Sequence, residues 1–236
     1  MEFEHVLVKR SGDFTTITMN RPQRRNALSL EHMRELITAF GELGSSDALG
    51  IVLAGSGPVF SAGHDFADTA GADLPYMRAL LATCTDLMTL IQQVPQPVVA
   101  RVHGLATAAG CQLVATADLV VASENAGFAA PGGKGGWFCH TPMVPIARSI
   151  GRKRAFELAL SGEVIDARTA ASPGAIQVLA HIPDLLGPGR SAEMTYYETP
   201  SGAKVFAAGA LNFGASLGSP EVDRLLANVW ARLTVP

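Results

Sequence analysis

The chain has 236 residues and a mass of 24.7 kDa, of which 48% are hydrophobic and 17% are charged. This composition is typical of a protein that buries a large core, and it excludes a disordered chain. The 18 lysines and arginines against 21 aspartates and glutamates give a net charge of −3, so the overall charge gives no indication of binding to nucleic acid.

Three cysteines, Cys84, Cys111 and Cys139, lie far apart, and no Cys-x-x-Cys pair is present. The sequence therefore predicts neither a disulfide framework nor a metal site, and it favours a reducing compartment, which we take to be the cytoplasm. The first ten residues lack the apolar core of a signal peptide. No apolar run approaches the ~18 residues of a membrane span, so we expect no membrane association.

The apolar pattern predicts strands that alternate with helices, which favours an α/β fold built from a repeated two-layer unit. Ser29 is a typical N-cap and Gly44 a typical helix stop. The predicted elements are, in chain order, a hairpin (3–9 and 14–19), a helix from Ser29 to Gly44, a strand (50–55), a helix (74–94), a strand (97–102), a helix of small residues (108–117), a strand (118–122) and helical pieces over 141–171.

The composition changes near residue 172. Gly187-Pro-Gly189 indicates a linker, and strand-like runs over 193–199 and 203–208 flank Pro200-Ser-Gly202, which predicts a hairpin. Pro220 is placed to open a last helix over 219–233. The predicted organisation is therefore a domain over 1–171, a linker over 172–190, and an atypical β-hairpin plus helix over 191–236.

Two glycine-rich stretches have backbones that can approach a ligand closely. Phe60-Ser-Ala-Gly-His-Asp65 follows a strand-like run, and its small residues leave the amides accessible. Gly104-Leu-Ala-Thr-Ala-Ala-Gly-Cys-Gln112 runs into a helix, so amides near Ala109 lie where the helix dipole favours negative charge. Two such amides aimed at one point form an oxyanion hole. Tight packing of small residues explains the same pattern, and spacing alone leaves both interpretations open.

A series of motifs runs through the chain in a fixed order. They are Asn20-Arg-Pro with Asn26-Ala-Leu28, Gly57-Pro-Val-Phe-Ser-Ala-Gly-His-Asp65, Pro97-Val-Val-Ala-Arg-Val-His-Gly104, Gly110-Cys-Gln-Leu-Val-Ala115, Asp118-Leu-Val-Val-Ala122, Phe128-Ala-Ala-Pro131 and Gly162-Glu-Val-Ile-Asp-Ala167. In this order and spacing, residues from about 3 to 171 resemble the crotonase (enoyl-CoA hydratase/isomerase) superfamily. Trp137-Phe-Cys-His-Thr-Pro142 looks most like its enoyl-CoA hydratase domain-containing branch.

The resemblance implies a fold and a site. The fold is a spiral of repeated ββα turns, with an acyl-CoA between them. The backbone N–H groups of His64 and Ala109 are implied to hold the thioester oxygen, with no need for either side chain. Coenzyme A is then part of the substrate and no cofactor is permanently bound. The positions implied to line coenzyme A are Arg24, Ala27, Leu28, Ala62, Asp65, Phe66 and Ala67.

This sequence departs from the family where hydratases carry two glutamates. The first of these positions is Gln112 and the second is Gly132, and neither residue can titrate. General acid–base groups each contribute about 10²–10⁴-fold, so the loss of both removes roughly 10⁴–10⁸ if the effects multiply. Ala67 also replaces a basic residue that is often found in the family, which is expected to weaken phosphate binding. Water addition is therefore expected to be slow, while binding survives.

Few residues offer a substitute for the missing glutamates. His140 and Cys139 follow Gly132 closely, and Cys111 adjoins Gln112. A histidine near an acyl group serves as a base at neutral pH, and a Cys–His pair supplies a nucleophile and a base. The alternative is that the histidine is a packed side chain and the cysteines are inert and buried.

The C-terminal part departs from the family as well. Residues 193–210 look faintly like the C-terminal part of N,N-dimethylformamidase large-subunit-like proteins, in place of the family's assembling helices. The resemblance still implies a homo-oligomer, either a trimer or a hexamer.

Two function hypotheses follow. The first is an enoyl-CoA hydratase/isomerase-like enzyme that stabilises the enolate of an acyl-CoA or enoyl-CoA thioester. The second is a CoA-thioester-binding or interaction protein on the same fold, without catalysis. A minor third makes the C-terminal part a component of an amidase-type assembly.

Overall fold

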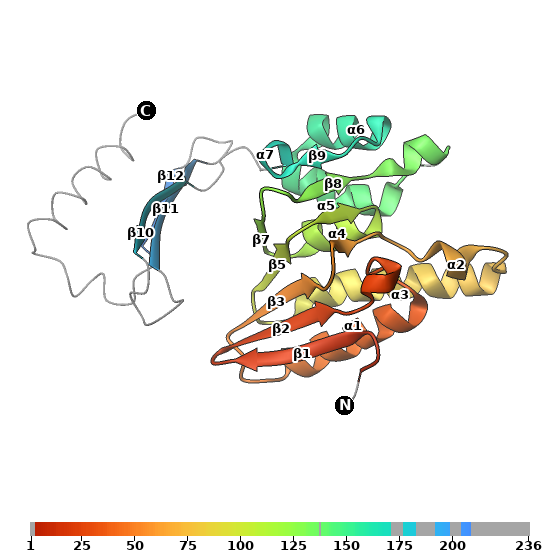
Figure 1. Ribbon diagram of the computed structural model, residues 1–236, viewed down its shortest axis with the longest axis horizontal. Coiled ribbons are helices and arrows are strands. Elements are labelled where there is room, and N and C mark those ends of the chain that lie inside the picture. Colours follow the sequence, from red (N-terminus) through yellow and green to blue (C-terminus); the bar gives the residue numbers. More distant parts are fainter. Residues whose placement is uncertain (1–2, 137, 171–176, 183–191, 199–203, 209–236) are drawn as a thin grey trace, which may run out of the picture. The chain divides into compact units, whose positions relative to one another are not determined.

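The computed structural model describes residues 3–136, 138–170, 177–182, 192–198 and 204–208 (Figure 1). The chain divides into two compact units, Met1–Ala170 and Ala171–Pro236. This division lies next to residue 171, where the sequence analysis ends the first domain.

A five-stranded sheet with the order β1-β2-β3-β5-β7 is the larger sheet of the first unit (Figure 1). The antiparallel pair β1 (Val6–Ser11) and β2 (Phe14–Met19) confirms the predicted hairpin. Three strands continue the sheet in parallel from β2, namely β3 (Gly50–Gly55), β5 (Val98–Val102) and β7 (Leu119–Ala122). Parallel pairing requires a crossover between successive strands, and the chain supplies one each time.

A second, four-stranded sheet has the order β4-β6-β8-β9. Its first three strands are parallel and three residues long: β4 (Val59–Ser61), β6 (Leu105–Thr107) and β8 (Gly127–Ala129). The short β9 (Ile165–Asp166) closes the sheet in the antiparallel direction. The first turn places both β1 and β2 in the large sheet before α1, and each later turn places one strand in the large sheet and the next in the small sheet before it adds a helix. This arrangement confirms the predicted spiral of ββα turns.

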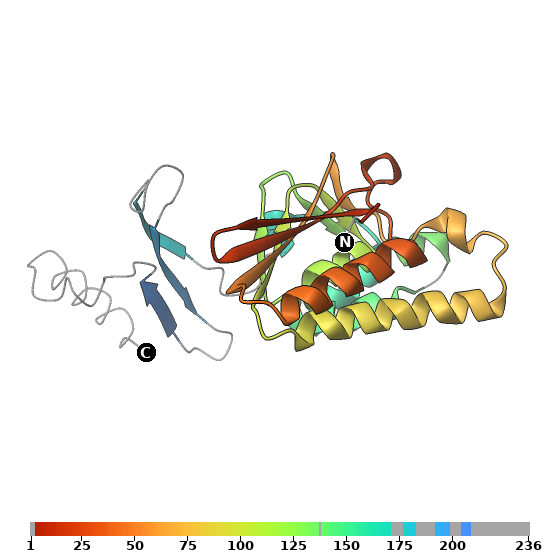
Figure 2. The ribbon, with the colours of Figure 1, turned by 90° about the horizontal axis from the view of Figure 1, so that it is seen from below.

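Two long helices, α1 (Leu30–Gly44) and α3 (Leu74–Gln93), lie side by side along one face of the large sheet (Figure 2). Both begin at side-chain caps, since Ser29 Oγ accepts from His32 N at 3.1 Å and Asp73 Oδ1 accepts from Tyr76 N at 2.8 Å. Each fully buried large apolar side chain stabilises the fold by about 1.5–3 kcal/mol. The fully buried large residues on the two helices are Met33, Leu36, Phe40, Leu80, Leu87 and Ile91.

Shorter helices complete the first unit and connect its strands. The helix α4 (Ala109–Thr116) confirms the predicted helix of small residues, and three helices separated by short breaks confirm the predicted helical pieces over 141–171. The remaining elements are η1 (Pro22–Arg24), α2 (Phe66–Thr69), η2 (Pro131–Gly135), α5 (His140–Ile150), α6 (Arg152–Ser161) and α7 (Ala167–Ala170).

The second unit contains a three-stranded antiparallel sheet with the order β10-β11-β12. The pairing of β11 (Ala192–Glu198) with β12 (Lys204–Ala208) confirms the predicted hairpin. Strand β10 (Gln177–Ile182) pairs with β11 and lies inside residues 172–190, so the prediction of a linker is wrong for this strand. The turn residues on which that prediction rested come after β10. The predicted helix over 219–233 lies outside the described residues.

Candidate functional site

Three loops meet at one edge of the small sheet. Because β4, β6 and β8 are parallel, the residues that follow their carboxyl ends gather at the same edge. Thr107 Oγ1 donates to the carbonyl of Ala62 at 3.0 Å, and Ala108 N donates to the carbonyl of Ala129 at 3.0 Å. These bonds join the loop after β4 to the start of α4, and the start of α4 to the end of β8. The edge brings together three of the predicted positions, His64, Ala109 and Gly132.

Two glycines allow the loop after β4 to lie against the start of α4. Gly63 has a φ of +84°, and a Cβ there would lie 2.9 Å from the Thr107 oxygen and 3.2 Å from the Ala109 nitrogen. A Cβ on Gly110 would overlap the carbonyl oxygen of Ser61. Any side chain at these two positions would push the loop and the helix apart. The glycines of the two stretches singled out in the sequence therefore serve a single junction.

The backbone leaves the N–H groups of His64 and Ala109 without a role in holding this junction. Leu28 N donates to the Gly63 oxygen at 2.7 Å and Asp65 N donates to the Leu28 oxygen at 3.2 Å, so the N–H of His64 points away from Leu28. Ala109 is the first residue of α4, and its N–H has no acceptor within the helix. Ala108 before it has a φ of 49° and a ψ of −119°, a strained backbone of the kind found at functional sites.

Two buried polar atoms at this edge have no hydrogen-bond partner. They are Nδ1 of His64 and Oε1 of Gln112. Gln112 as a whole is only 7% exposed. Burial lowers the pKa of His64, opposed by a contact with the backbone of Leu28, so the ring is neutral at neutral pH. Buried polar groups are nearly always satisfied, so each of these two atoms needs an explanation, and a bound water or ligand is one.

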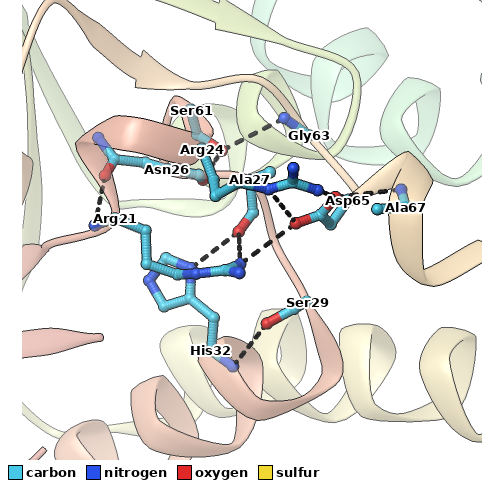
Figure 3. Close-up of polar contacts among 10 residues, drawn as sticks. All are labelled: Arg21, Arg24, Asn26, Ala27, Ser29, His32, Ser61, Gly63, Asp65 and Ala67. Atoms are coloured by element: carbon cyan, nitrogen blue, oxygen red, sulfur yellow. Dashed lines mark hydrogen bonds and ion pairs between the residues drawn. The ribbon is translucent and has the colours of Figure 1, made fainter. Parts of the chain in front are cut away.

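Asp65 joins the loop after β4 to the segment that follows β2 (Figure 3). Arg24 reaches its carboxylate with Nη2 at 2.5 Å and Nε at 3.2 Å, and Arg21 Nη1 lies at 3.5 Å. The carboxylate also accepts from Ala67 N at 3.1 Å and so caps α2. Burial opposes the ionisation of Asp65, but the hydrogen bonds from Arg24 and Ala67 and the two positive charges outweigh it. They hold its pKa below the ordinary value.

Asn26 holds the same segment against β4 and the turn before it. It has a φ of 51°, and its Nδ2 lies within hydrogen-bond distance of three carbonyl oxygens, at 2.8 Å from Ser56, 2.8 Å from Val59 and 3.1 Å from Phe60. Its Oδ1 accepts from Arg21 N at 2.9 Å. Asparagine tolerates this left-handed conformation better than most residues do. One fully buried side chain thus connects two segments far apart in the sequence.

The carbonyl of Ala27 accepts two hydrogen bonds, from Arg21 Nη1 and from His32 Nδ1, both at 3.0 Å (Figure 3). Because a carbonyl only accepts, Nδ1 of His32 carries the proton and Nε2 does not. Burial lowers the pKa of His32 to about 4 despite that hydrogen bond, and Nε2 has no partner. The histidine is therefore neutral over the physiological range.

The structure brings most of the positions predicted to line coenzyme A into one place. Arg24, Ala27, Leu28, Ala62 and Asp65 all belong to the contacts described above. Phe66 and Ala67 lie at the start of α2 and are exposed, Phe66 to 69%. Asp65 is only 4% exposed, and its carboxylate faces the two arginines.

Sequence reasoning missed Arg21, Asn26 and His32, although the first two belong to a motif that it quoted. The available signal was an arginine and an asparagine next to a Pro22 turn, where Asn commonly adopts the left-handed conformation. The partners that connect Arg21 and Asn26 to other segments lie 30 to 44 residues away in the chain, which no local pattern reveals.

The proposed substitutes for the glutamates differ in their surroundings. Cys111 is buried in α4, and burial raises the pKa of its thiol to about 12, so it is protonated at neutral pH. Cys139 is buried before α5, whereas His140 is exposed with Nδ1 at 3.1 Å from the carbonyl of Phe138. A protonated thiol is a poor nucleophile, which argues against Cys111 as a reacting group.

Within the part of the chain that the structure describes, no three His, Cys, Asp or Glu side chains form a group that could hold a metal ion. The described helices include none with the length and apolar character needed to cross a membrane.

The sequence matches the family model described as enoyl-CoA hydratase/isomerase over residues 9–212, which extends beyond residue 171, where the resemblance based on motifs ends. It is 42% identical over 179 residues to the mitochondrial enoyl-CoA hydratase domain-containing protein 3 of Danio rerio, covering 73% of this chain and 61% of the relative. It is 31% identical over 220 residues to a probable enoyl-CoA hydratase of Mycobacterium bovis, covering 90% and 82%. The chain thus spans less than two thirds of the length of the first of these relatives.

Solved structures show the same fold. An enoyl-CoA hydratase of Mycobacterium smegmatis has a TM-score of 0.68 and 47% identity, with 70% of this chain and 66% of the other covered. The human enoyl coenzyme A hydratase domain-containing protein 3 has a TM-score of 0.69 and 39% identity, with 71% and 67% covered.

Proposed function

Because the chain belongs to the enoyl-CoA hydratase/isomerase (crotonase) family, we propose that it binds an acyl-CoA thioester and stabilises the enolate of that thioester. The backbone N–H groups of His64 and Ala109 would donate to the thioester oxygen. The observation that carries the proposal is the junction at Gly63, which sets the loop of His64 against the nitrogen of Ala109. Fixed N–H donors aimed at a developing oxyanion each contribute about 10²–10³-fold.

Coenzyme A in this proposal lies along the segments that Asp65 joins. Arg24 keeps its side chain 46% exposed while it is paired, so it can still attract a phosphate group. The exposed ring of Phe66 offers an apolar surface beside the same segments. Because Ala67 carries no charge, we expect the phosphates to be held less tightly than where a basic residue stands at this position.

The titratable groups needed for hydration are absent from the positions where the family resemblance puts them. Gln112 is buried with its Oε1 unpartnered, and Gly132 has no side chain. Addition of water to a double bond requires proton transfer to carbon and from water, which an amide cannot perform. This observation favours a second candidate function, the binding of CoA thioesters without catalysis.

Self-association is part of the proposal, as a trimer or a hexamer. Supporting it, β7 at the end of the large sheet exposes three successive apolar side chains, Leu119 (55%), Val120 (44%) and Val121 (61%). Exposed apolar edge strands are prone to pair with another chain. Light scattering of the full chain and of Val121→Lys would test this, and a monomeric mass for the unaltered chain would contradict it.

The rate of hydration separates the two candidate functions. Loss of the conjugated thioester absorbance of crotonyl-CoA should be far slower than the median enzyme turnover of about 10 s⁻¹. The double substitution Gln112→Glu with Gly132→Glu should raise the rate if the pocket is otherwise intact. Turnover near the median in the unaltered chain would show that other groups supply the protons.

The oxyanion donors are tested by calorimetric titration with an acyl-CoA. Ala109→Pro removes the N–H at this position and should weaken binding. His64→Ala keeps the N–H and should leave the affinity within a few-fold. Equal losses in both variants would point to a role for the His64 side chain instead.

A further inference from the structure

Asp65 is a buried carboxylate whose contacts all lead to the segments around the proposed oxyanion donors. A buried charge is costly unless it is paired and hydrogen-bonded. Here Arg24 supplies two hydrogen bonds, Arg21 a third at 3.5 Å, and Ala67 N a fourth. Both arginines come from the segment after β2, so the side chain of Asp65 ties the loop of His64 to that segment.

The backbone on both sides of His64 is tied to the same segment. Ala62 N donates to the carbonyl of Arg25 at 3.0 Å, and Asp65 N donates to the carbonyl of Leu28 at 3.2 Å. Apart from the single bridge between Leu28 and His64, no sheet ladder orders these residues. The direction of the His64 N–H therefore depends on how firmly residues 62–65 are held against residues 25–28.

From this arrangement we infer that Asp65 is a positioning residue, which fixes the N–H of His64 toward the thioester oxygen through its ion pairs with Arg24 and Arg21 (Figure 3). The inference rests on the proposed function. It differs from the role that the family resemblance implies for Asp65, which is contact with coenzyme A. It also differs from a purely stabilising ion pair, because only a positioning role makes the carboxylate matter more for one part of the ligand than for another.

Two ligands isolate the contact with the thioester oxygen. Butyryl-CoA carries that oxygen, and S-butyl-CoA is a thioether of the same length that lacks it. The ratio of their dissociation constants measures the contribution of the oxyanion donors alone. In Asp65→Asn the amide would place N–H donors against the guanidinium groups, so the loop should relax. We expect the preference of this variant for the thioester to fall about tenfold, which is the effect of one lost hydrogen bond, while its affinity for the thioether changes less than twofold.

A second variant and a control keep the test decisive. Arg24→Gln weakens the same ion pair from a half-exposed position and should lower the ratio in the same direction, even if Asp65→Asn folds poorly. Asp47→Asn removes the exposed ion pair with Arg10 and should leave the ratio unchanged. The inference is overturned if Arg24→Gln, or a folded Asp65→Asn, weakens both ligands equally or neither. If the unaltered chain shows no preference for the thioester, the proposed function fails and the inference falls with it.

Discussion

The two sides of the candidate site differ in how they are held and in what chemistry they offer. On one side, the segment after β2 and the loop after β4 are joined by a network of ionic and amide hydrogen bonds around Asp65 and Asn26. On the other, α4 and η2 offer Gln112, Gly132 and the protonated thiol of Cys111. In the proposed function, binding geometry and proton transfer are therefore built from separate parts, so one can persist without the other.

The largest effect is expected on the side that is held by polar contacts. Asn26→Ala leaves one buried and two part-buried carbonyls without their shared donor and places alanine in a left-handed conformation. We expect a loss of about 3–4 kcal/mol in the free energy of unfolding, measured by chemical denaturation. Gln23→Ala, an exposed position two residues into the same turn, is the control and should stay within about 0.5 kcal/mol. A small loss in Asn26→Ala would show that the network is redundant.

Acid should lower the free energy of unfolding because His32, on the same side of the site, is buried in its neutral form. In the unfolded chain the ring takes a proton near its ordinary pKa of 6.5, but in the folded protein only near 4, so the unfolded state binds more protons between these values. Stability is then fully present above 6.5 and falls as the pH drops toward 4, by up to about 3 kcal/mol. Denaturation at pH 7 and pH 4.5 measures the fall. His32→Leu should flatten it, and a variant that keeps the same slope would assign the acid sensitivity to other groups.

The junction between the two sides should be sensitive to one added methyl group. In Gly63→Ala the added methyl group meets both a positive φ and a close contact with Thr107. We expect the free energy of unfolding to fall by about 2 kcal/mol and the preference for the thioester over the thioether to be lost. Gly71→Ala is the matched control, since its φ of +74° imposes the same strain but nothing lies within 4 Å of the added Cβ. It should cost about 1 kcal/mol and leave ligand preference unchanged. Equal effects of the two changes would mean that the junction accommodates the added methyl group without a steric clash.

The smallest effect is expected at an ion pair outside the site. Arg10 and Asp47 pair on the surface, where solvent screens the charges and the side chains lose entropy on pairing. Asp47→Asn should leave the melting temperature within measurement error at any salt concentration. A clear drop would contradict the view that ion pairs matter here only where they are buried.

Much of the large sheet and its helices could be predicted because their runs of apolar residues are long enough to show a strand or helix periodicity. The helix from Leu30 follows a typical N-cap at Ser29 and ends at Gly44, the predicted stop. The small sheet was missed because β4, β6 and β8 have three residues each, too few to show an alternation. Those strands exist because their neighbours hold them in parallel, which is information from distant parts of the chain.

The candidate site shows the same limit. His64 and Ala109 could be named from glycine-rich turns and a family resemblance, and the structure brings their loops to one edge. The contacts of Asn26 and the ion pairs of Asp65 could not, because they join positions about 30 to 44 residues apart. A polar residue in a turn looks the same in sequence whether it faces solvent or holds two loops together.

The buried thiols give this protein internal reporters of its own motions. Cys84 in α3 and Cys111 in α4 are buried, and burial also raises the pKa of their thiols to about 11 and about 12. A thiol reagent can therefore react with either one only when the surrounding structure opens. The two modification rates would then measure local opening of two helices that pack on the same core. Binding of an acyl-CoA at the proposed oxyanion donors should slow labelling of Cys111 more than labelling of Cys84. Ligand binding would then be visible without any introduced probe.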